Sequence, residues 1–311
     1  MATLKELTSN PERLAGGHRL CAGCGASIAV RQILLAAGDT PLVAGCATGC
    51  LEVSTTIYPY SSWRVPFIHN AFENSAATVS GVEAAFKGLQ RAGKIPANKK
   101  MKFVAFGGDG GTYDIGLQSL SGAMERGHDM VYVCYDNGAY MNTGIQRSSA
   151  TPMGAWATTS EVGKAQQGKQ QRRKDLTSIM AAHGIPYAAQ ASVSHWRDLT
   201  TKAEKAFAVE GPAFLNVLAP CPRGWRTASN QAIAIAKLAV QTGFWPMFEV
   251  EDGVWRQTVK VPERKPIEEF LKPQGRFKHL FTPENAEFLV TIQAEVDKYW
   301  EYIQKRCACE G

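Results

Sequence analysis

The chain has 311 residues, of which 45% are hydrophobic, 20% charged and 9% aromatic. This composition is typical of a globular protein and excludes a disordered or low-complexity polymer. The net charge of +6 is spread along the chain rather than concentrated in a basic block, so nucleic-acid binding is not indicated. There is no apolar run of the roughly 18 residues that a membrane span needs, and residues 1–13 are polar, so a cytoplasmic protein is expected.

Apolar strands alternate with amphipathic helices along the first two thirds of the chain. Strands are expected at residues 41–46, 102–107, 130–136, 187–190 and 213–218, and helices at 26–37, 73–92, 114–126, 174–183 and 196–209. This alternation predicts an α/β fold with a doubly wound, mostly parallel sheet.

The pattern changes after the last of these strands. A helix is expected at residues 229–242, followed by an irregular proline-containing stretch and a long amphipathic helix at 283–305. The apolar face of that last helix indicates core or subunit contact. We therefore expect an α/β domain at residues 1–222 and an extension at 223–311 that packs on the domain or on partner subunits.

A glycine-rich segment, residues 107–111, follows the strand expected at 102–107. Its backbone N–H groups can approach a phosphate, and Asp109 within it can hold a divalent cation. Asn137 follows the next strand, so a parallel sheet returns it to the same edge. Gly-Asp-Gly followed by this asparagine is typical of a thiamine diphosphate site with Mg²⁺, whereas no Rossmann GxGxxG opens the first helix.

Four of the eight cysteines are placed to converge. Cys21 and Cys24 form a CxxC in a glycine-rich loop, and Cys50 and Cys221 each follow an expected strand. Four thiolates suit either a structural zinc ion or a [4Fe-4S] cluster, and a lone CxxC completed by two isolated cysteines favours the cluster. Cys46 is an alternative to Cys50 in this set.

The other cysteines are assigned no chemistry. Cys134 lies in an apolar strand and is interpreted as a small core residue, and Cys307 and Cys309 lie at the C-terminus.

These motifs resemble those of a known family, the β subunits of 2-oxoacid:ferredoxin oxidoreductases of the pyruvate synthase type, including the oxalate oxidoreductase branch. The resemblance covers roughly residues 17–225. It is carried by GHRLCAGCG, ATGCLEVSTTIYPY, IHNAFENSAATVSG, FGGDGGTYDIGLQSLSGAMERGH, DNGAYMNTGIQRSSATP and LAPCP. It implies a thiamine-diphosphate-binding fold that holds the diphosphate half of the cofactor site and one proximal [4Fe-4S] cluster.

The resemblance also implies roles for individual residues. The cluster ligands would be Cys21, Cys24, Cys50 and Cys221. The Mg²⁺ ligands would be Asp109 and Asn137 by their side chains and Ala139 by its carbonyl. Asn142 would lie near the thiazolium and the substrate as a catalytic residue. The cofactor-binding set would be Gly108, Asp109, Gly110, Gly111, Asn137, Ala139, Asn142 and Cys50.

The implied reaction is oxidative decarboxylation of a 2-oxoacid, with pyruvate giving acetyl-CoA and CO₂ and electrons passing through the cluster to ferredoxin. The implied partners are a pyrimidine-binding α subunit, a subunit with ferredoxin-type clusters, ferredoxin and coenzyme A. In this family the α subunit supplies the carboxylate that activates the cofactor, so Glu52 and Glu73 are not given that role. Gly138 stands where related subunits are often acidic, which leaves oxalate or a branched 2-oxoacid open as the substrate.

Two other classes of protein share part of this pattern. A non-redox thiamine-dependent lyase would share Asp109 and Asn137 but has no use for four converging cysteines. A zinc-stabilised binding module would keep the cysteines and leave the Gly-Asp-Gly segment without a purpose.

Several polar residues receive structural interpretations. His18 and His69 are interpreted as structural histidines rather than proton donors. The basic residues before the helix expected at 174–183 are interpreted as a solvated loop rather than a docking site for an acidic partner; they are Lys164, Lys169, Arg172, Arg173 and Lys174.

Overall fold

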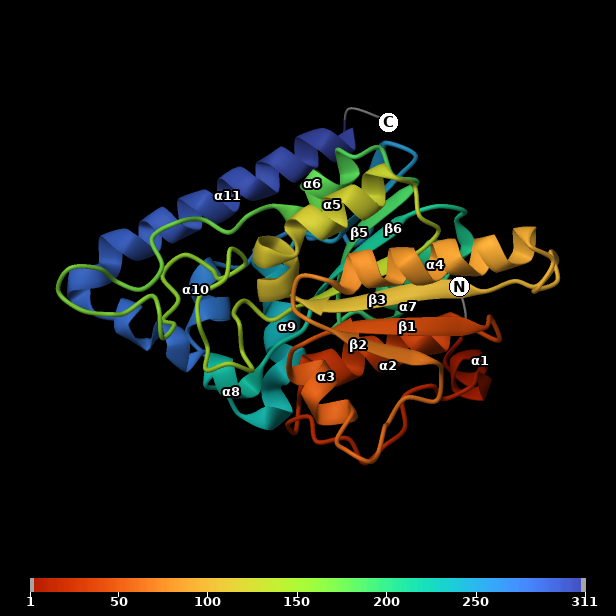
Figure 1. Cartoon of the computed structure of the whole chain (residues 1–311). Coiled ribbons are helices and arrows are strands. Elements are labelled where there is room, and N and C mark those ends of the chain that lie inside the picture. The colour runs from red at the N-terminus through yellow and green to blue at the C-terminus, as the bar shows by residue number, and fades with distance from the viewer. Residues whose placement is uncertain (1–2, 309–311) are drawn as a thin grey trace.

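A computed structural model describes residues 3–308. They build one eight-stranded sheet in the order β2-β1-β3-β4-β6-β5-β7-β8, with helices on both faces (Figure 1). The strands are β1 Leu42–Ala47, β2 Phe67–Asn70, β3 Lys102–Gly108, β4 Val131–Asp136, β5 Tyr187–Ser192, β6 Ala213–Leu218, β7 Phe248–Glu251 and β8 Val254–Gln257.

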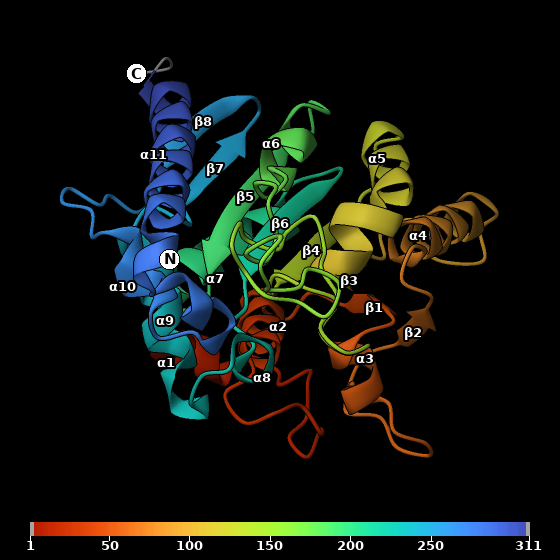
Figure 2. The same cartoon turned by 90° about the vertical axis from the view of Figure 1, so that its left-hand side faces the viewer.

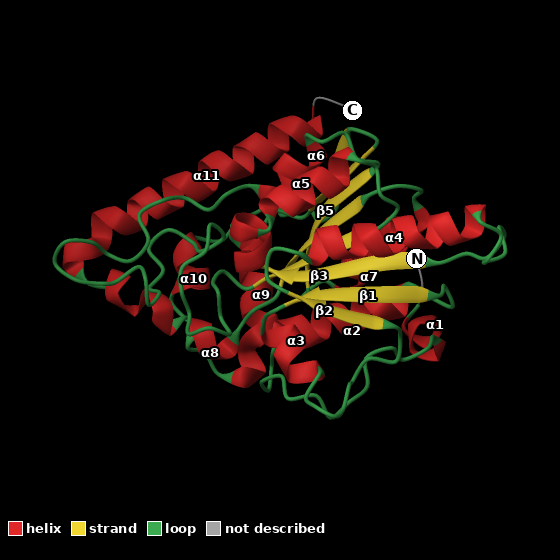
Figure 3. Cartoon of the chain, viewed as in Figure 1, coloured by secondary structure: helices red, strands yellow, loops and turns green. Residues whose placement is uncertain are grey.

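Strands β1 to β6 pair in parallel, whereas β7 pairs antiparallel with β5 and β8 antiparallel with β7. The expected doubly wound, mostly parallel sheet is therefore confirmed. Every residue of β4, β5 and β6 is buried, as expected when helices cover both faces of a sheet. The carboxyl ends of the parallel strands open into a region of long loops (Figure 3).

The helices form two outer layers (Figure 2). One face of the sheet carries α4 Ser75–Arg91, α5 Leu117–Glu125 and α6 Leu176–Ala181, and the other carries α2 Gly25–Ala36 and α7 Trp196–Ala208. The remaining α-helices are α1 Leu4–Ser9, α3 Cys50–Thr55, α8 Pro222–Trp225, α9 Ala232–Gln241, α10 Ile267–Leu271 and α11 Ala286–Ala308. Three 3₁₀ turns are η2 Ser229–Gln231, η3 Gly275–Leu280 and η4 Pro283–Asn285. Within residues 3–308 no helix has both the length and the apolar character needed to cross a membrane.

The strands and helices expected between residues 26 and 218 are all present, with small shifts at their ends. The largest shift concerns the helix expected from residue 114. A π-helical turn, η1 Gly110–Ile115, comes first, and α5 begins at Leu117. The Gly116 amide donates to the Gly111 carbonyl five residues back at 2.7 Å, which is the π-helical hydrogen bond.

The expectation of an irregular stretch after residue 242 is wrong. That stretch contains β7 and β8, which extend the sheet beyond β5, and also α10 and η3. Each of the two strands has only four residues, too few for alternation to stand out in the sequence. Helix α11 lies along one side of the molecule (Figure 1), and its Ile292, Val296 and Trp300 are buried against the same chain.

Candidate functional site

The ends of β3 and β4 place Asp109 and Asn137 beside each other. Both residues are buried, Asp109 completely. The Asn137 backbone amide donates to Asp109 Oδ1 at 3.2 Å, and the Ser148 hydroxyl donates to Asp109 Oδ2 at 2.5 Å. Burial, followed by the nearby Asp136 carboxylate, raises the pKa of Asp109 to about 8. This carboxylate is therefore costly to ionise unless a cation lies beside it.

The side-chain amide of Asn137 lies against two oxygen atoms. One end of the amide is 2.9 Å from the Ala139 carbonyl oxygen and 3.0 Å from Asp109 Oδ1. With its nitrogen at this end the amide donates to both oxygens, and with its oxygen there it adds a third oxygen donor for a cation. Neighbouring oxygens in an octahedral Mg²⁺ shell, each about 2.1 Å from the ion, are about 3 Å apart. The oxygen cluster of Asp109, Asn137 and Ala139 thus presents the donor types that a divalent cation takes.

A buried polar network supports the loop that carries this cluster. Asp136 is paired with Arg173 and accepts hydrogen bonds from the Tyr113 hydroxyl at 2.7 Å and the Gly138 amide at 3.1 Å. The Arg173 guanidinium also stacks on the Trp245 ring, 4.5 Å from its centroid. Because its carboxylate bonds the Gly138 amide, Asp136 holds the backbone that immediately follows Asn137.

The interpretation of the basic stretch as a solvated loop is wrong for three of its residues. Lys169 is 2% exposed and donates to the Thr151 carbonyl at 2.6 Å, Arg173 joins the network beneath Asn137, and Lys174 bonds the Tyr113 carbonyl. Lys164 and Arg172 are exposed, as expected. The sequence of these basic residues does not indicate which of their side chains are buried.

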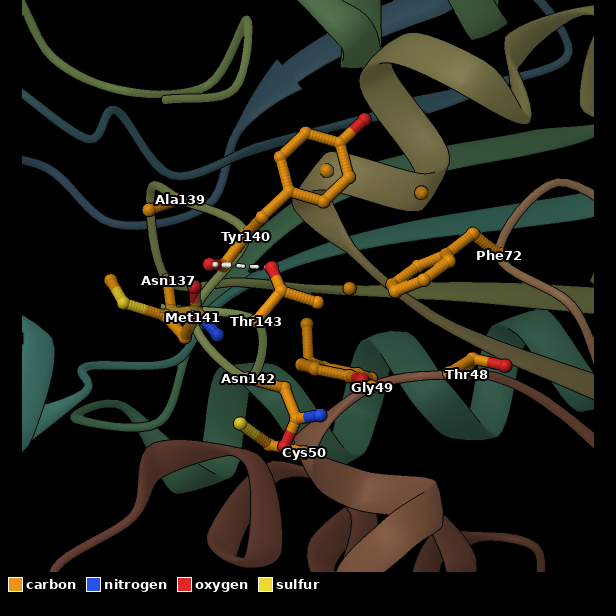
Figure 4. A pocket seen from close by; sticks show the side chains of 14 residues that line it. Thr48, Gly49, Cys50, Phe72, Asn137, Ala139, Tyr140, Met141, Asn142 and Thr143 are labelled. Atoms are coloured by element: carbon orange, nitrogen blue, oxygen red, sulfur yellow. Dashed lines mark hydrogen bonds between the residues drawn. The ribbon is translucent and has the colours of Figure 1, made fainter. Parts of the chain in front are cut away.

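A pocket opens above the oxygen cluster (Figure 4). It is lined by Thr48, Gly49, Cys50, Phe72, Gly108, Gly110, Gly111, Tyr135, Asn137, Ala139, Tyr140, Met141, Asn142 and Thr143. In Figure 4 the side chain of Asn142 is directed toward Cys50. The pocket thus gathers every predicted cofactor-binding residue except Asp109, which lies buried just beneath it.

The glycines that line the pocket have no room for a side chain. A Cβ at Gly110 would lie 2.4 Å from the Tyr140 ring, and one at Gly111 would lie 2.9 Å from the Phe72 carbonyl oxygen. The bare backbone at these positions lets the pocket wall approach a bound group closely.

Close packing brings the CxxC loop against the segment that carries Cys221. The Gly25 amide donates to the Pro220 carbonyl at 2.9 Å, and a Cβ at Gly23, whose φ is +73°, would lie 1.9 Å from the Ser229 carbonyl oxygen. These two glycines therefore permit an approach that no other residue would allow.

The cysteine group, which consists of Cys21, Cys24, Cys50 and Cys221, has members near enough to interact electrostatically. Burial, followed by the charges of the other three cysteines, raises the pKa of Cys50 to about 12. Burial also raises the pKa of Cys221, to about 11, with Cys24 and Cys21 adding to the effect. Within residues 3–308 no three His, Cys, Asp or Glu side chains are arranged to hold a single metal ion. A four-iron cluster holds its thiolates farther apart than a single ion does, so a cluster site need not look like a single-ion site. Four cysteine sulfurs are the number and kind of donors that such a cluster takes.

Other residues singled out in the sequence lie elsewhere. Cys46 and Cys134 are completely buried within strands, so Cys134 is a core residue as predicted and Cys50 rather than Cys46 lies with the other cysteines. Cys307 lies on α11, and Cys309 is outside the described residues. His69 contacts Thr48 Oγ1 at 3.0 Å, whereas the buried Nδ1 of His18 has no hydrogen-bond partner among the described residues.

Comparison with known proteins agrees with this geometry. Residues 44–217 match the family model described as thiamine pyrophosphate enzyme, C-terminal TPP binding domain. A solved structure of 2-oxoglutarate:ferredoxin oxidoreductase from Magnetococcus marinus shares the fold, with a TM-score of 0.56, 20% identity, and coverage of 72% of this chain and 79% of that one.

Curated relatives match along almost the whole chain. Pyruvate synthase subunit PorB of Thermotoga maritima is 56% identical over 289 residues, covering 92% of this chain and 89% of that protein. PorB of Methanocaldococcus jannaschii is 52% identical, covering 96% and 97%. Ketoisovalerate oxidoreductase subunit VorB of Pyrococcus furiosus is 45% identical, covering 94% and 93%. The chain therefore belongs to the family of β subunits of the thiamine-diphosphate-dependent 2-oxoacid:ferredoxin oxidoreductases.

Proposed function

We propose that this β subunit serves an enzyme that oxidatively decarboxylates pyruvate, transfers the acetyl group to coenzyme A and passes the electrons to ferredoxin. The relatives named as pyruvate synthase subunits, at 56% and 52% identity, support pyruvate over a branched 2-oxoacid, for which the VorB relative is 45% identical. The observation that carries the proposal is the oxygen cluster at the ends of β3 and β4, beneath a glycine-walled pocket.

The oxygen cluster would hold Mg²⁺ through Asp109 Oδ1, Asn137 Oδ1 and the Ala139 carbonyl. The Asn137 amide lies 2.9 Å and 3.0 Å from the other two oxygens, close to the length of an octahedral edge, and diphosphate oxygens and water would complete the shell. A cation there would also balance the Asp109 carboxylate, which burial otherwise keeps protonated near neutral pH.

Gly108, Gly110 and Gly111 would form the wall against which the diphosphate lies. Thiamine diphosphate, when bound, supplies the electron sink for decarboxylation. The residues of this chain would position it: the oxygen cluster holds the metal-bound end, and the exposed Asn142 at the pocket mouth would contact the thiazolium end and the substrate.

Cys21, Cys24, Cys50 and Cys221 would hold one [4Fe-4S] cluster. Cys50 lines the cofactor pocket and also belongs to the cysteine group. A cluster bound there would lie next to the cofactor, which is the arrangement that rapid electron transfer needs. Neither a non-redox lyase nor a zinc-stabilised binding module would need a cysteine that belongs both to the cofactor pocket and to the cysteine group.

Other subunits would complete the enzyme. The carboxylate that activates the cofactor would come from a pyrimidine-binding α subunit, and a further subunit with ferredoxin-type clusters would carry electrons to ferredoxin. Tyr58 and Tyr60, in the loop after α3, are 94% and 78% exposed. Large exposed aromatic side chains of this kind are typical of protein contact surfaces.

The test is the composition and activity of the anaerobically purified complex. We expect thiamine diphosphate, Mg²⁺, and iron and sulfide in equal amounts, with about four of each assigned to this chain once the clusters of the other subunits are subtracted. Pyruvate with coenzyme A should reduce ferredoxin faster than branched 2-oxoacids do, and oxalate should not. Zinc without sulfide on this chain would contradict the redox assignment.

A further inference from the structure

Tyr135 has a buried hydroxyl that the protein itself does not use. The residue is 2% exposed and lies on β4, two positions before Asn137. Among the described residues its hydroxyl oxygen has no hydrogen-bond partner. A buried, unpaired hydroxyl lowers the stability of a folded protein, and in native structures such groups are uncommon.

The surroundings of this hydroxyl show where its proton can go. The Leu51 amide lies near the oxygen, but an N–H group is a donor and cannot accept the hydroxyl proton. A tyrosine hydroxyl carries its proton at neutral pH, so it remains available as a donor.

Two glycines pack against the Tyr135 side chain on the side of the pocket, so only bare backbone covers its hydroxyl there. A Cβ at Gly49 would lie 2.7 Å from the Tyr135 hydroxyl oxygen, and a Cβ at Gly108 would lie 3.3 Å from the Tyr135 ring. Gly49 has extended backbone angles that any residue can adopt, so its lack of a side chain reflects this contact rather than its conformation. Tyr135, Gly49 and Gly108 all line the pocket.

We infer that Tyr135 is a further cofactor-binding residue, whose hydroxyl donates a hydrogen bond to a diphosphate oxygen of the bound cofactor. This inference rests on the proposed function, which places the diphosphate against Gly108. A diphosphate presents several acceptor oxygens to this wall, and a hydrogen bond to a charged acceptor is stronger than one to a neutral group.

Tyr132 provides a matched control on the same strand. It is also 2% exposed, but its hydroxyl is paired with Thr112 Oγ1 at 3.1 Å. Replacing either tyrosine by phenylalanine removes one oxygen atom and keeps the ring. The two variants therefore differ in whether the lost hydroxyl had a partner inside the protein.

The experiment measures binding of Mg²⁺ with thiamine diphosphate, and of Mg²⁺ with inorganic pyrophosphate, to the assembled enzyme after its cofactor has been removed. Tyr135→Phe should weaken both by about tenfold or more, whereas Tyr132→Phe should bind both like the wild type. Without cofactor, Tyr135→Phe should melt no lower than the wild type, because it loses no internal bond, and Tyr132→Phe should melt lower.

Two outcomes would overturn the inference. Equal affinity of the wild type and Tyr135→Phe for both probes would mean that the hydroxyl does not contact the cofactor. Weakened binding of thiamine diphosphate alone, with pyrophosphate binding unchanged, would place the contact at the thiazole end. Failure of the wild-type enzyme to bind either probe would instead contradict the proposed function, so the two failures are distinguishable.

Discussion

The oxygen cluster and the cysteine group lie at the same edge of the sheet but are built differently. Asp109 and Asn137 are buried. Ser148 donates a hydrogen bond to Asp109, and Asp136, which is paired with Arg173, holds the backbone beside Asn137. The residues of the cysteine group are exposed or partly exposed, and they come from separate parts of the chain. The first region is organised before a ligand arrives. The second brings its donors near one another, and a bound cluster would set the final geometry.

This difference has an energetic basis. Carboxylate, amide and carbonyl oxygens can be held close together by neighbouring hydrogen bonds. Four thiolates cannot, because their mutual repulsion and burial favour the neutral thiols unless a metal binds. The raised pKa values of Cys50 and Cys221 reflect this. Changes in the two regions should therefore affect different properties of the enzyme.

The largest expected effect is that of Asp109→Ala. It removes the charged member of the oxygen cluster, so affinity for Mg²⁺ with thiamine diphosphate should fall by more than about 100-fold. Iron content should remain at the wild-type level, because the cysteine group is not altered. Calorimetry with cofactor, together with iron analysis of the same sample, checks both points. Loss of iron along with the cofactor would show that the two regions do not assemble independently.

Cys221→Ser should have the converse effect. Iron and sulfide assigned to this chain should be lost and electron transfer to ferredoxin should stop, while thiamine diphosphate binding persists. Cys307→Ser, at a cysteine outside the group, should keep the full iron content. A Cys221→Ser enzyme that retains its iron and reduces ferredoxin normally would remove Cys221 from the ligand set.

Arg173→Met should show how far the network organises the oxygen cluster. It leaves the buried Asp136 carboxylate without its cation, which should lower the free energy of unfolding by about 3 kcal/mol. Cofactor affinity should fall as well, because Asp136 bonds the Gly138 amide beside Asn137. Denaturant unfolding and cofactor titration measure the two effects. Arg172→Met, at the exposed neighbouring position, is the control and should change neither.

The smallest effect concerns Lys169 and pH. Burial, then Arg147 and Arg173, lowers its pKa to about 7, whereas Asp114 and Asp109 act in the opposite direction. Between about pH 7 and 10 the unfolded chain binds a proton there that the folded chain does not, so this residue makes stability rise with pH.

Unfolding measured against pH should therefore differ between the wild type and Lys169→Met. The wild type should gain up to about 1.4 kcal/mol per pH unit relative to Lys169→Met above pH 7. Lys164→Met, at an exposed position, should follow the wild-type curve. Parallel curves for the wild type and Lys169→Met would mean that Lys169 keeps an ordinary pKa.

Most strands and helices up to residue 218 could be predicted from the sequence because they have a clear apolar periodicity. The short elements α3 and β2, of six and four residues, could not. The positions of Asp109, Asn137, Cys50 and Cys221 at one edge followed from the same argument, since parallel strands end on the same side. The strands β7 and β8 could not be predicted, because each has only four residues and β7 joins the sheet by pairing with β5, which is far away in the chain.

By itself, the sequence determined the fold class, the Gly-Asp-Gly and asparagine pair, and the cysteines that can converge, because these depend on residue type and local spacing. The tertiary structure decided which charges fold inward, as Lys169 and Arg173 do, and which of two tyrosines in one strand keeps a free hydroxyl. Both outcomes depend on what packs against a side chain. In the sequence Val-Tyr-Val-Cys-Tyr-Asp, Tyr132 and Tyr135 look alike, and only Thr112 and Gly49 distinguish them.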